Sequence, residues 1–163
     1  MSEPIALFSV DTYRMEDSVG YLLSRARAML AKSLDTALLA HDITHAQAGI
    51  LLMLSSGKYD TAADLVREIY TDAASMTRML DRLQKRGLLD RVPHPEDRRQ
   101  TCLRLTEQGR GLATRLPPIL TEVLNAQFAD FSPEEIGFLK SLLRKMLQAG
   151  GGQDIGRASI AAT

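Results

Sequence analysis

The spacing of apolar residues changes abruptly after Gly87, and this change limits the folds open to the chain. Before this point apolar residues recur at helical spacing, whereas residues 88–92 and 101–105 are short strand-like segments. The second segment alternates apolar and polar residues, and the stretch 93–97 between the two is rich in turn-forming residues. The sequence therefore predicts a mainly α fold that contains one small β-hairpin.

Two helices are expected immediately before the hairpin. Thr61 and Asp64 form a cap pattern that opens a short helix. A second helix is expected to start at Thr71 or Asp72 and to end at Gly87. A short helix, a tight turn, a second helix and a hairpin follow one another in the winged helix-turn-helix fold, which this order predicts for the middle third of the chain.

Further helices are expected before this segment. Residues 19–38 carry one apolar stripe of a long amphipathic helix. Thr44 and Gln47 form a capping box for the helix that follows, and Gly57 is expected to end it.

Helical spacing returns after Thr106. Pro117 and Pro118 interrupt this run and are expected to kink or break the helix, because proline lacks a backbone N–H. Ser132, followed by proline and two glutamates, is a strong start signal for a last helix. Glycines at 150–152 are expected to close that helix, and the tail over 149–163 is expected to be disordered.

The chain has no net charge, but its positive charge is concentrated in one block. Residues 67–104 carry nine Lys/Arg against six Asp/Glu, whereas residues 1–66 carry five against eight. A basic block is what contact with DNA phosphates requires, although a charge run is also common on a solvated surface. Cys102 is the single cysteine, which excludes an internal disulfide. Neither a signal peptide nor a membrane-spanning run is recognised, so a cytoplasmic protein without a membrane partner is expected.

The helix predicted directly before the hairpin has two distinct faces. Met76, Met79, Leu80 and Leu83 share one face, which is expected to pack on the preceding helices. The residues expected to contact DNA share the other face, and they are Ala74, Ser75, Thr77, Arg78, Arg82 and Lys85. Asp81 on this face would repel phosphate and is expected to pair with an arginine. The alternative is a charged, solvated face that binds nothing.

Asp97, Arg98 and Arg99 fall at the predicted tip of the hairpin. Two guanidinium groups on a narrow projection suit the minor groove of DNA. Asp97 is placed to support one of them through a charge-assisted hydrogen bond while the other points outward. The alternative is an ordinary charged turn without a ligand.

Taken together, these segments resemble the MarR family of winged helix-turn-helix transcriptional regulators. The run TRMLDRLQKRGLL over 77–89, followed by Arg91, is similar to the recognition helix of that family. The run PEDRR over 95–99, with Leu103, Leu105, Thr106 and Gly109, is similar to its wing and the start of its next helix. The resemblance extends over residues 12–148.

The resemblance implies how the chain is organised and what it binds. Helices within 12–44 and 107–148 are implied to form the dimerisation lobe of an obligate homodimer, and 45–106 the DNA-binding lobe that grips a pseudo-palindromic double-stranded DNA operator. Arg99 is implied to be held near Asp97, which leaves Arg98 for DNA, although the two roles can be exchanged. Repression is the implied mode. Tyr70–Thr71 replaces a turn that often contains glycine, so a less sharp turn is expected.

The resemblance also implies a small-molecule effector, a small aromatic carboxylate or a phenol, and no cofactor. The candidate ligand-binding residues flank the junction of the first two helices, and they are Tyr13, Arg14, Tyr21, Arg25, His41 and His45. An arginine beside an aromatic or histidine side chain suits an aromatic carboxylate. Each of these residues can equally be an ordinary surface or linker residue.

Three other functions have weaker support in the sequence. The three histidines lack the spacing of metal ligands, and no phosphate-binding loop or nucleophile motif occurs, so neither an enzyme nor a metal site is expected. A redox-sensing regulator would need a reactive Cys102, whereas its place on a predicted strand favours a buried thiol. A helical protein-interaction module that does not bind DNA would leave the charged hairpin unexplained.

Overall fold

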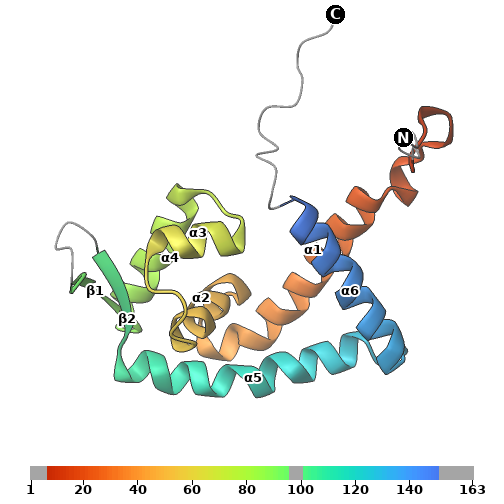
Figure 1. Cartoon of the computed structure of the whole chain (residues 1–163). Coiled ribbons are helices and arrows are strands. Elements are labelled where there is room, and N and C mark those ends of the chain that lie inside the picture. Colours follow the sequence, from red (N-terminus) through yellow and green to blue (C-terminus); the bar gives the residue numbers. More distant parts are fainter. Residues whose placement is uncertain (1–6, 96–100, 151–163) are drawn as a thin grey trace, which may run out of the picture. The chain divides into compact units, whose positions relative to one another are not determined.

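The computed structural model describes residues 7–95 and 101–150 (Figure 1). The helices and strands are α1 Val19–Leu38, α2 His45–Ser55, α3 Ala62–Ile69, α4 Ala73–Lys85, β1 Leu89–Pro93, β2 Thr101–Leu105, α5 Glu107–Gln127 and α6 Pro133–Gly150, with short 3-10 turns at Val10–Thr12, Met15–Asp17 and Leu39–His41. The chain divides after Gln127 into two compact units. The predicted mainly α fold with one hairpin is confirmed.

The predicted helix ends of the first unit are also confirmed. Thr44 and Gln47 form a complete capping box at the start of α2. The side chain of Thr61 accepts a hydrogen bond at the start of α3, and that of Asp72 does so at the start of α4. Gly57 and Gly87 have φ angles of 72° and 67° just past α2 and α4, a left-handed conformation that glycine adopts without strain.

The hairpin pairs β1 with β2 in antiparallel register, with Leu89 opposite Leu105. Its first strand begins one residue later than expected because the backbone of Leu88 completes the end of α4. The N–H of Leu88 donates to the carbonyl of Leu83 at 3.0 Å, and the N–H of Gly87 donates to that of Gln84 at 2.8 Å. This pair of bonds is the Schellman pattern, which satisfies the last free carbonyls of a helix.

One hydrophobic core joins the elements of the first unit. Its fully buried side chains come from all of α1 to α5 and from the strands, and the largest are Leu38, Ile50, Leu51, Leu65, Met76, Leu80, Leu83, Leu88, Leu89 and Leu116. In Figure 1, α5 passes below α2 and below the lower end of α1. The core thereby holds the helix-turn-helix and the hairpin on the long helices.

The start of α5 is docked tightly against the end of α4. Thr106 donates from its hydroxyl to the carbonyl of Gly87 at 2.6 Å and accepts from the N–H of Gly109 at 3.0 Å. A Cβ atom at Gly109 would lie 1.9 Å from the carbonyl oxygen of Leu88. Only glycine fits this close approach of two backbones.

The prolines were expected to kink or break this helix, and the break is wrong, since α5 runs through both Pro117 and Pro118; the kink stays a prediction. The two prolines cannot donate to the carbonyls one turn earlier, which costs about 3 kcal/mol or more for each proline inside a helix. Leu112, Ala113 and Leu116 on the preceding turns are buried in the core. We attribute the continuity of α5 to this burial, which offsets the lost hydrogen bonds.

The first helix buries few of its apolar side chains within the first unit. It starts at Ser18, whose side chain accepts from the N–H of Tyr21, and only Leu38 among its residues is buried. Val19, Leu22 and Met29 are each about half exposed. Within residues 7–95 and 101–150, no single helix is both long and apolar enough to cross a membrane. The segments Val19–His41 and His45–Ser55 reach that length and apolar character only when they are counted as one, and the chain bends by 76° between them.

The second unit contains α6 and the turn before it. At the start of α6 the backbone N–H of Glu135 donates to the hydroxyl of Ser132 at 3.2 Å, and the backbone N–H of Ser132 donates to the carboxylate of Glu135 at 2.8 Å. The start signal in the sequence predicted this cap. The rings of Phe128 and Phe131 pack edge to face at 5.2 Å. The helix includes residues 149 and 150, which were expected in the tail, and the rest of that expectation lies outside the described residues.

Candidate nucleic-acid interface

The two faces of α4 are sorted as the sequence predicts. Met76, Leu80 and Leu83 are buried, and Met79 is partly buried against the same core. Five of the predicted DNA contacts are exposed on the other side, namely Ala74, Thr77, Arg78, Arg82 and Lys85, while Ser75 is half-buried. The helix therefore carries small and hydroxyl side chains on its first two turns and cations along the rest of its outer face.

Arg78 is held by the first turn of α4. Its guanidinium donates to the hydroxyl of Ser75 at 2.8 Å. Asp72 accepts from the N–H of Ser75 at 2.7 Å, and the pKa of this carboxyl is lowered by its hydrogen bonds with Ser75 and by the nearby charge of Arg78. Ser75 thus links the cap of the helix to the cation most suited to reach a base edge.

Asp81 pairs with an arginine, as expected, and the partner is Arg91 on β1. The guanidinium of Arg91 lies 2.7 Å from the Asp81 carboxylate and also donates to the side-chain oxygen of Gln84. The pair compensates the one carboxylate on the outer face of α4. It also ties the hairpin to the helix through side chains that both sit at the surface.

The turn between α3 and α4 is tight without glycine, so the expectation of a less sharp turn is wrong. Tyr70 adopts the left-handed conformation at φ 52° and ψ 50°. The N–H of Thr71 reaches the carbonyl of Val66 at 3.4 Å. A non-glycine residue pays about 1–2 kcal/mol for this conformation, which the packing of the two helices must supply.

The second strand of the hairpin is anchored by Asp60, which the sequence analysis did not single out. Its backbone carbonyl accepts from the N–H of Leu103 at 2.7 Å, and its carboxylate lies 3.6 Å from the thiol of Cys102 and 3.8 Å from the guanidinium of Arg104. Cys102 is fully buried, and burial raises the pKa of its thiol. The predicted buried thiol is confirmed, whereas Asp97, Arg98 and Arg99 lie outside the described residues.

The six candidate ligand residues do not gather at one place in the first unit. Arg25 donates to the hydroxyl of Tyr21 at 3.1 Å and lies over its ring at 5.7 Å. Tyr13 and Arg14 precede α1, whereas His41 and His45 follow it. At 1.5 Å per residue, Tyr21 and the end of α1 are roughly 25 Å apart. Only His45 among the six lines a cavity that also reaches α4.

That cavity, which we call the α1–α4 cavity, has a volume of about 670 Å³. Its lining residues are Arg27, His45, Ala46, Gly49, Ile69, Tyr70, Thr71, Ser75 and Met79. A ring nitrogen of His45 lies 2.9 Å from Asp35. Burial opposes ionisation of Asp35, but the hydrogen bonds and charge of His45 outweigh it and lower the pKa of this carboxyl. The cavity thus offers one cation, an aromatic ring and hydroxyl groups, and the sequence missed Arg27.

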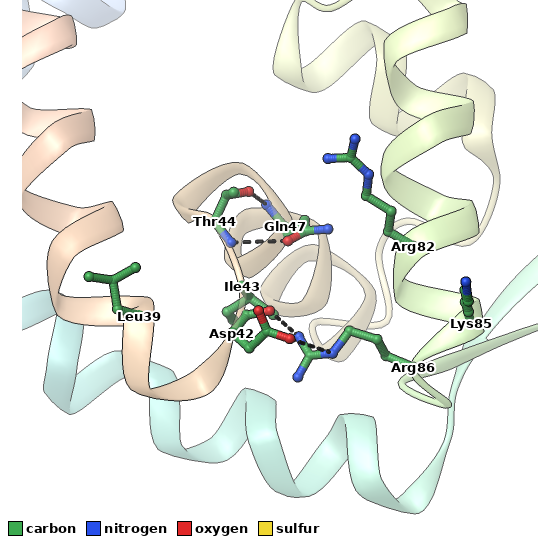
Figure 2. A pocket seen from close by; sticks show the side chains of 8 residues that line it. All are labelled: Leu39, Asp42, Ile43, Thr44, Gln47, Arg82, Lys85 and Arg86. Carbon is green, nitrogen blue, oxygen red and sulfur yellow. Dashed lines mark hydrogen bonds and ion pairs between the residues drawn. The ribbon is translucent and has the colours of Figure 1, made fainter.

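A second cavity, of about 370 Å³, lies between the end of α4 and the turn that joins α1 to α2 (Figure 2). Its lining residues are Leu39, Asp42, Ile43, Thr44, Gln47, Arg82, Lys85 and Arg86. Arg86 reaches across to this turn, where it donates to the carbonyls of His41 and Asp42. Arg86 is therefore committed to holding the turn, which leaves Arg82 and Lys85 as the cations of this lining that are available to a ligand or to DNA.

Comparisons with known proteins agree on one family. The model of the MarR family matches residues 41–100. The multiple antibiotic resistance protein MarR of Escherichia coli is 30% identical over 107 residues, which are 65% of this chain and 74% of that protein.

Two solved structures extend the similarity. A cysteine-to-serine mutant of E. coli MarR complexed with operator DNA is 27% identical with a TM-score of 0.73, covering 79% of this chain and 93% of that one. Bordetella bronchiseptica BpsR, from a study of how 6-hydroxynicotinic acid regulates its DNA binding, is 28% identical with a TM-score of 0.73, covering 82% and 96%. With its capped helix-turn-helix, its hairpin and its sorted recognition helix, this chain belongs to the MarR family of transcriptional regulators.

Proposed function

We propose that the protein is a sequence-specific regulator that binds double-stranded operator DNA as a homodimer and acts as a repressor. The observation that carries this proposal is the outer face of α4, where Ser75, Thr77 and Arg78 stand on the first turns and Arg82 and Lys85 follow. Small and hydroxyl side chains let a helix backbone approach base edges, while the cations behind them suit phosphates. The matching MarR structure with operator DNA supports the same role for this helix.

Some of these side chains would determine which DNA sequence is bound, and others would determine how tightly DNA is bound. Arg78 would read a base edge with Ser75 and Thr77, and Ala74 would admit the backbone to the groove. Arg82 and Lys85 would contact phosphates. For the wing we keep the sequence-based proposal that Arg98 and Arg99 contact DNA with support from Asp97.

Homodimerisation has its support in exposed apolar side chains. Phe138, Leu142 and Met146 recur at four-residue spacing along α6 and are each about half exposed or more. Such a stripe marks a surface that another helix covers. Leu142→Asp is expected to yield a monomer in size-exclusion chromatography with light scattering, whereas Lys140→Asp on the polar side of α6 leaves a dimer. A wild-type monomer would contradict the proposal.

We further propose that the α1–α4 cavity binds a small aromatic carboxylate or phenol that releases the protein from DNA. Arg27 would pair with the carboxylate, and Tyr70, Ile69 and Met79 would flank the ring. Ser75 belongs to the same lining, so a ligand there would compete with DNA for the group that holds Arg78. The regulation of BpsR by 6-hydroxynicotinic acid supports this ligand class.

DNA binding is tested by fluorescence anisotropy with a labelled duplex from the region upstream of the protein's own gene. Tight binding that weakens steeply with salt is expected, because bound cations release counterions from DNA. A scrambled duplex of the same length is the control. Equal affinity for both duplexes would contradict sequence-specific binding, and salt-insensitive or absent binding would favour a protein-interaction module.

The effector site is tested by thermal shift with 6-hydroxynicotinic acid and benzoic acid. Binding to the native state raises the melting temperature. Arg27→Ala is expected to abolish the shift, while Arg25→Ala, on the same helix but outside the cavity, keeps it. Benzyl alcohol, which lacks the carboxylate, is expected to give a smaller shift. A shift that Arg25→Ala removes and Arg27→Ala preserves would place the ligand elsewhere.

A further inference from the structure

Three side chains of different chemistry converge beside the loop end of the hairpin, where Val92 and Pro93 pair with Cys102 and Thr101. Asp60 lies in the loop between α2 and α3, His94 follows β1, and Cys102 lies on β2. One carboxylate oxygen, one ring nitrogen and the thiol sulfur all lie within 4.8 Å of one another. Oxygen, nitrogen and sulfur together form a donor set that zinc and neighbouring divalent transition metals accept.

The separation between Cys102 and Asp60 matches tetrahedral coordination. The sulfur of Cys102 lies 3.6 Å from a carboxylate oxygen of Asp60. Two ligands held tetrahedrally by zinc, one sulfur at about 2.3 Å and one oxygen at about 2.1 Å, are about 3.6 Å apart. The separation of these two atoms is therefore compatible with one cation bound to both of them.

The backbone around two of the three donors, Asp60 and Cys102, is already held in place. Val92 pairs with Cys102 across the hairpin, and Leu103 donates its N–H to the carbonyl of Asp60 at 2.7 Å. Arg104 lies 3.8 Å from the same carboxylate oxygen of Asp60, and its side chain is half exposed, so it can turn outward when a cation takes that oxygen. Preformed backbone geometry reduces the ordering that metal binding would otherwise require.

We propose that Asp60, His94 and Cys102 form a three-ligand site for a divalent metal of the zinc class, with water in the fourth position. Binding replaces the thiol proton of Cys102, which is released to solvent as the sulfur becomes a thiolate ligand. The ion would clamp the loop before α3 to both arms of the hairpin. Because the hairpin leads to Arg98 and Arg99, occupancy would alter affinity for DNA, a consequence that rests on the proposed function.

The test uses the full-length homogeneous protein, stripped with a chelator and titrated with Co²⁺ as a spectroscopic substitute for zinc. One equivalent of Co²⁺ is expected to produce tetrahedral ligand-field absorption and a thiolate-to-cobalt charge-transfer band, and added Zn²⁺ is expected to displace both. Cys102→Ser removes the charge-transfer band. His94→Ala is expected to lower metal affinity by at least about tenfold, because the loss of a residue that only hydrogen-bonds to a metal ligand already costs that much. His41→Ala is the matched control and keeps the wild-type spectrum.

A wild-type protein without the charge-transfer band, or one whose band survives Cys102→Ser, overturns the proposal. If Cys102→Ser fails to fold, the His94→Ala variant still tests the proposal. Unchanged metal affinity in His94→Ala would also overturn the proposed metal site. DNA affinity measured with and without Zn²⁺ is a separate readout. Absent DNA binding would overturn the proposed function, whereas the cobalt spectrum tests the metal site by itself.

Discussion

The carboxylate of Asp81 on α4 lies 2.7 Å from the guanidinium of Arg91 on the first strand of the hairpin. The two side chains come from elements that together form the candidate DNA interface. Without its partner, the carboxylate would stand uncompensated among the cations of α4 and repel phosphate. The pair therefore serves the electrostatics of the interface more than the stability of the fold, to which exposed ion pairs contribute only about 0–1 kcal/mol.

Removing Arg91 is expected to weaken DNA binding through Asp81. We expect Arg91→Ala to lower affinity by roughly threefold to tenfold, equivalent to about 0.7–1.4 kcal/mol, because it leaves a bare carboxylate near phosphate. The double variant Asp81→Ala/Arg91→Ala is expected to recover most of this loss in the anisotropy assay. No recovery would mean that Arg91 contacts DNA itself.

Arg78 and Lys85 are expected to affect DNA binding in different ways. Arg78→Ala should relax preference at one base position, at a cost of about 1–3 kcal/mol, because a bidentate contact to a base edge is lost. Lys85→Ala should weaken binding to all duplexes alike and reduce the salt dependence by about one ion. The measurement is anisotropy over a set of single-base operator variants at several salt concentrations. The same uniform loss in both variants would show that α4 contacts only the backbone of DNA.

Gly109 and Gly111 lie in one helix and are expected to respond oppositely to alanine. At Gly109 the new Cβ would lie 1.9 Å from the carbonyl oxygen of Leu88, whereas nothing lies within 4 Å of a Cβ at Gly111. We expect Gly109→Ala to cost about 1–3 kcal/mol or more by forcing α5 away from α4. Gly111→Ala is expected to gain about 0.5–1 kcal/mol from helix propensity. Urea denaturation followed by circular dichroism measures both, and a tolerated Gly109→Ala would contradict the close docking of α5.

The Asp35–His45 pair is expected to stabilise the protein except in acid. Burial raises the pKa of Asp35 in the folded state, but the interactions with His45 lower it by more, so the folded pKa lies below the unfolded value of about 3.9. The stabilisation from Asp35 is therefore fully present above the unfolded pKa and is lost as pH falls through the folded pKa. Asp35→Asn should therefore lower the unfolding free energy at pH 7 and have a smaller effect at the acid end. Denaturation at the two pH values measures this, with the surface change Asp130→Asn as control. An equal loss at both pH values would assign the effect to packing.

Sequence and structure agree at the helix caps and helix faces, which depend on residues close together in the chain. The caps at Thr44, Thr61 and Asp72 were predictable because each is a hydrogen bond between a side chain and a backbone group three residues later. The inner face of α4 was predictable because helical spacing alone brings its apolar residues together. Those local rules, with the motif of the hairpin, were enough to indicate the fold and the candidate interface.

Contacts between distant segments were decided only by the tertiary structure. Arg91 as the partner of Asp81, Arg27 as the cation of the α1–α4 cavity, and the approach of Asp60 to Cys102 all depend on how helices and strands pack. Spacing along the chain carries no signal for such pairs. The sequence therefore did not indicate His94 as a metal ligand. Packing also overrode local preference, since burial kept α5 continuous through Pro117 and held Tyr70 in a left-handed conformation. The sequence by itself thus determined the elements and their faces, and only tertiary packing decided which side chains meet.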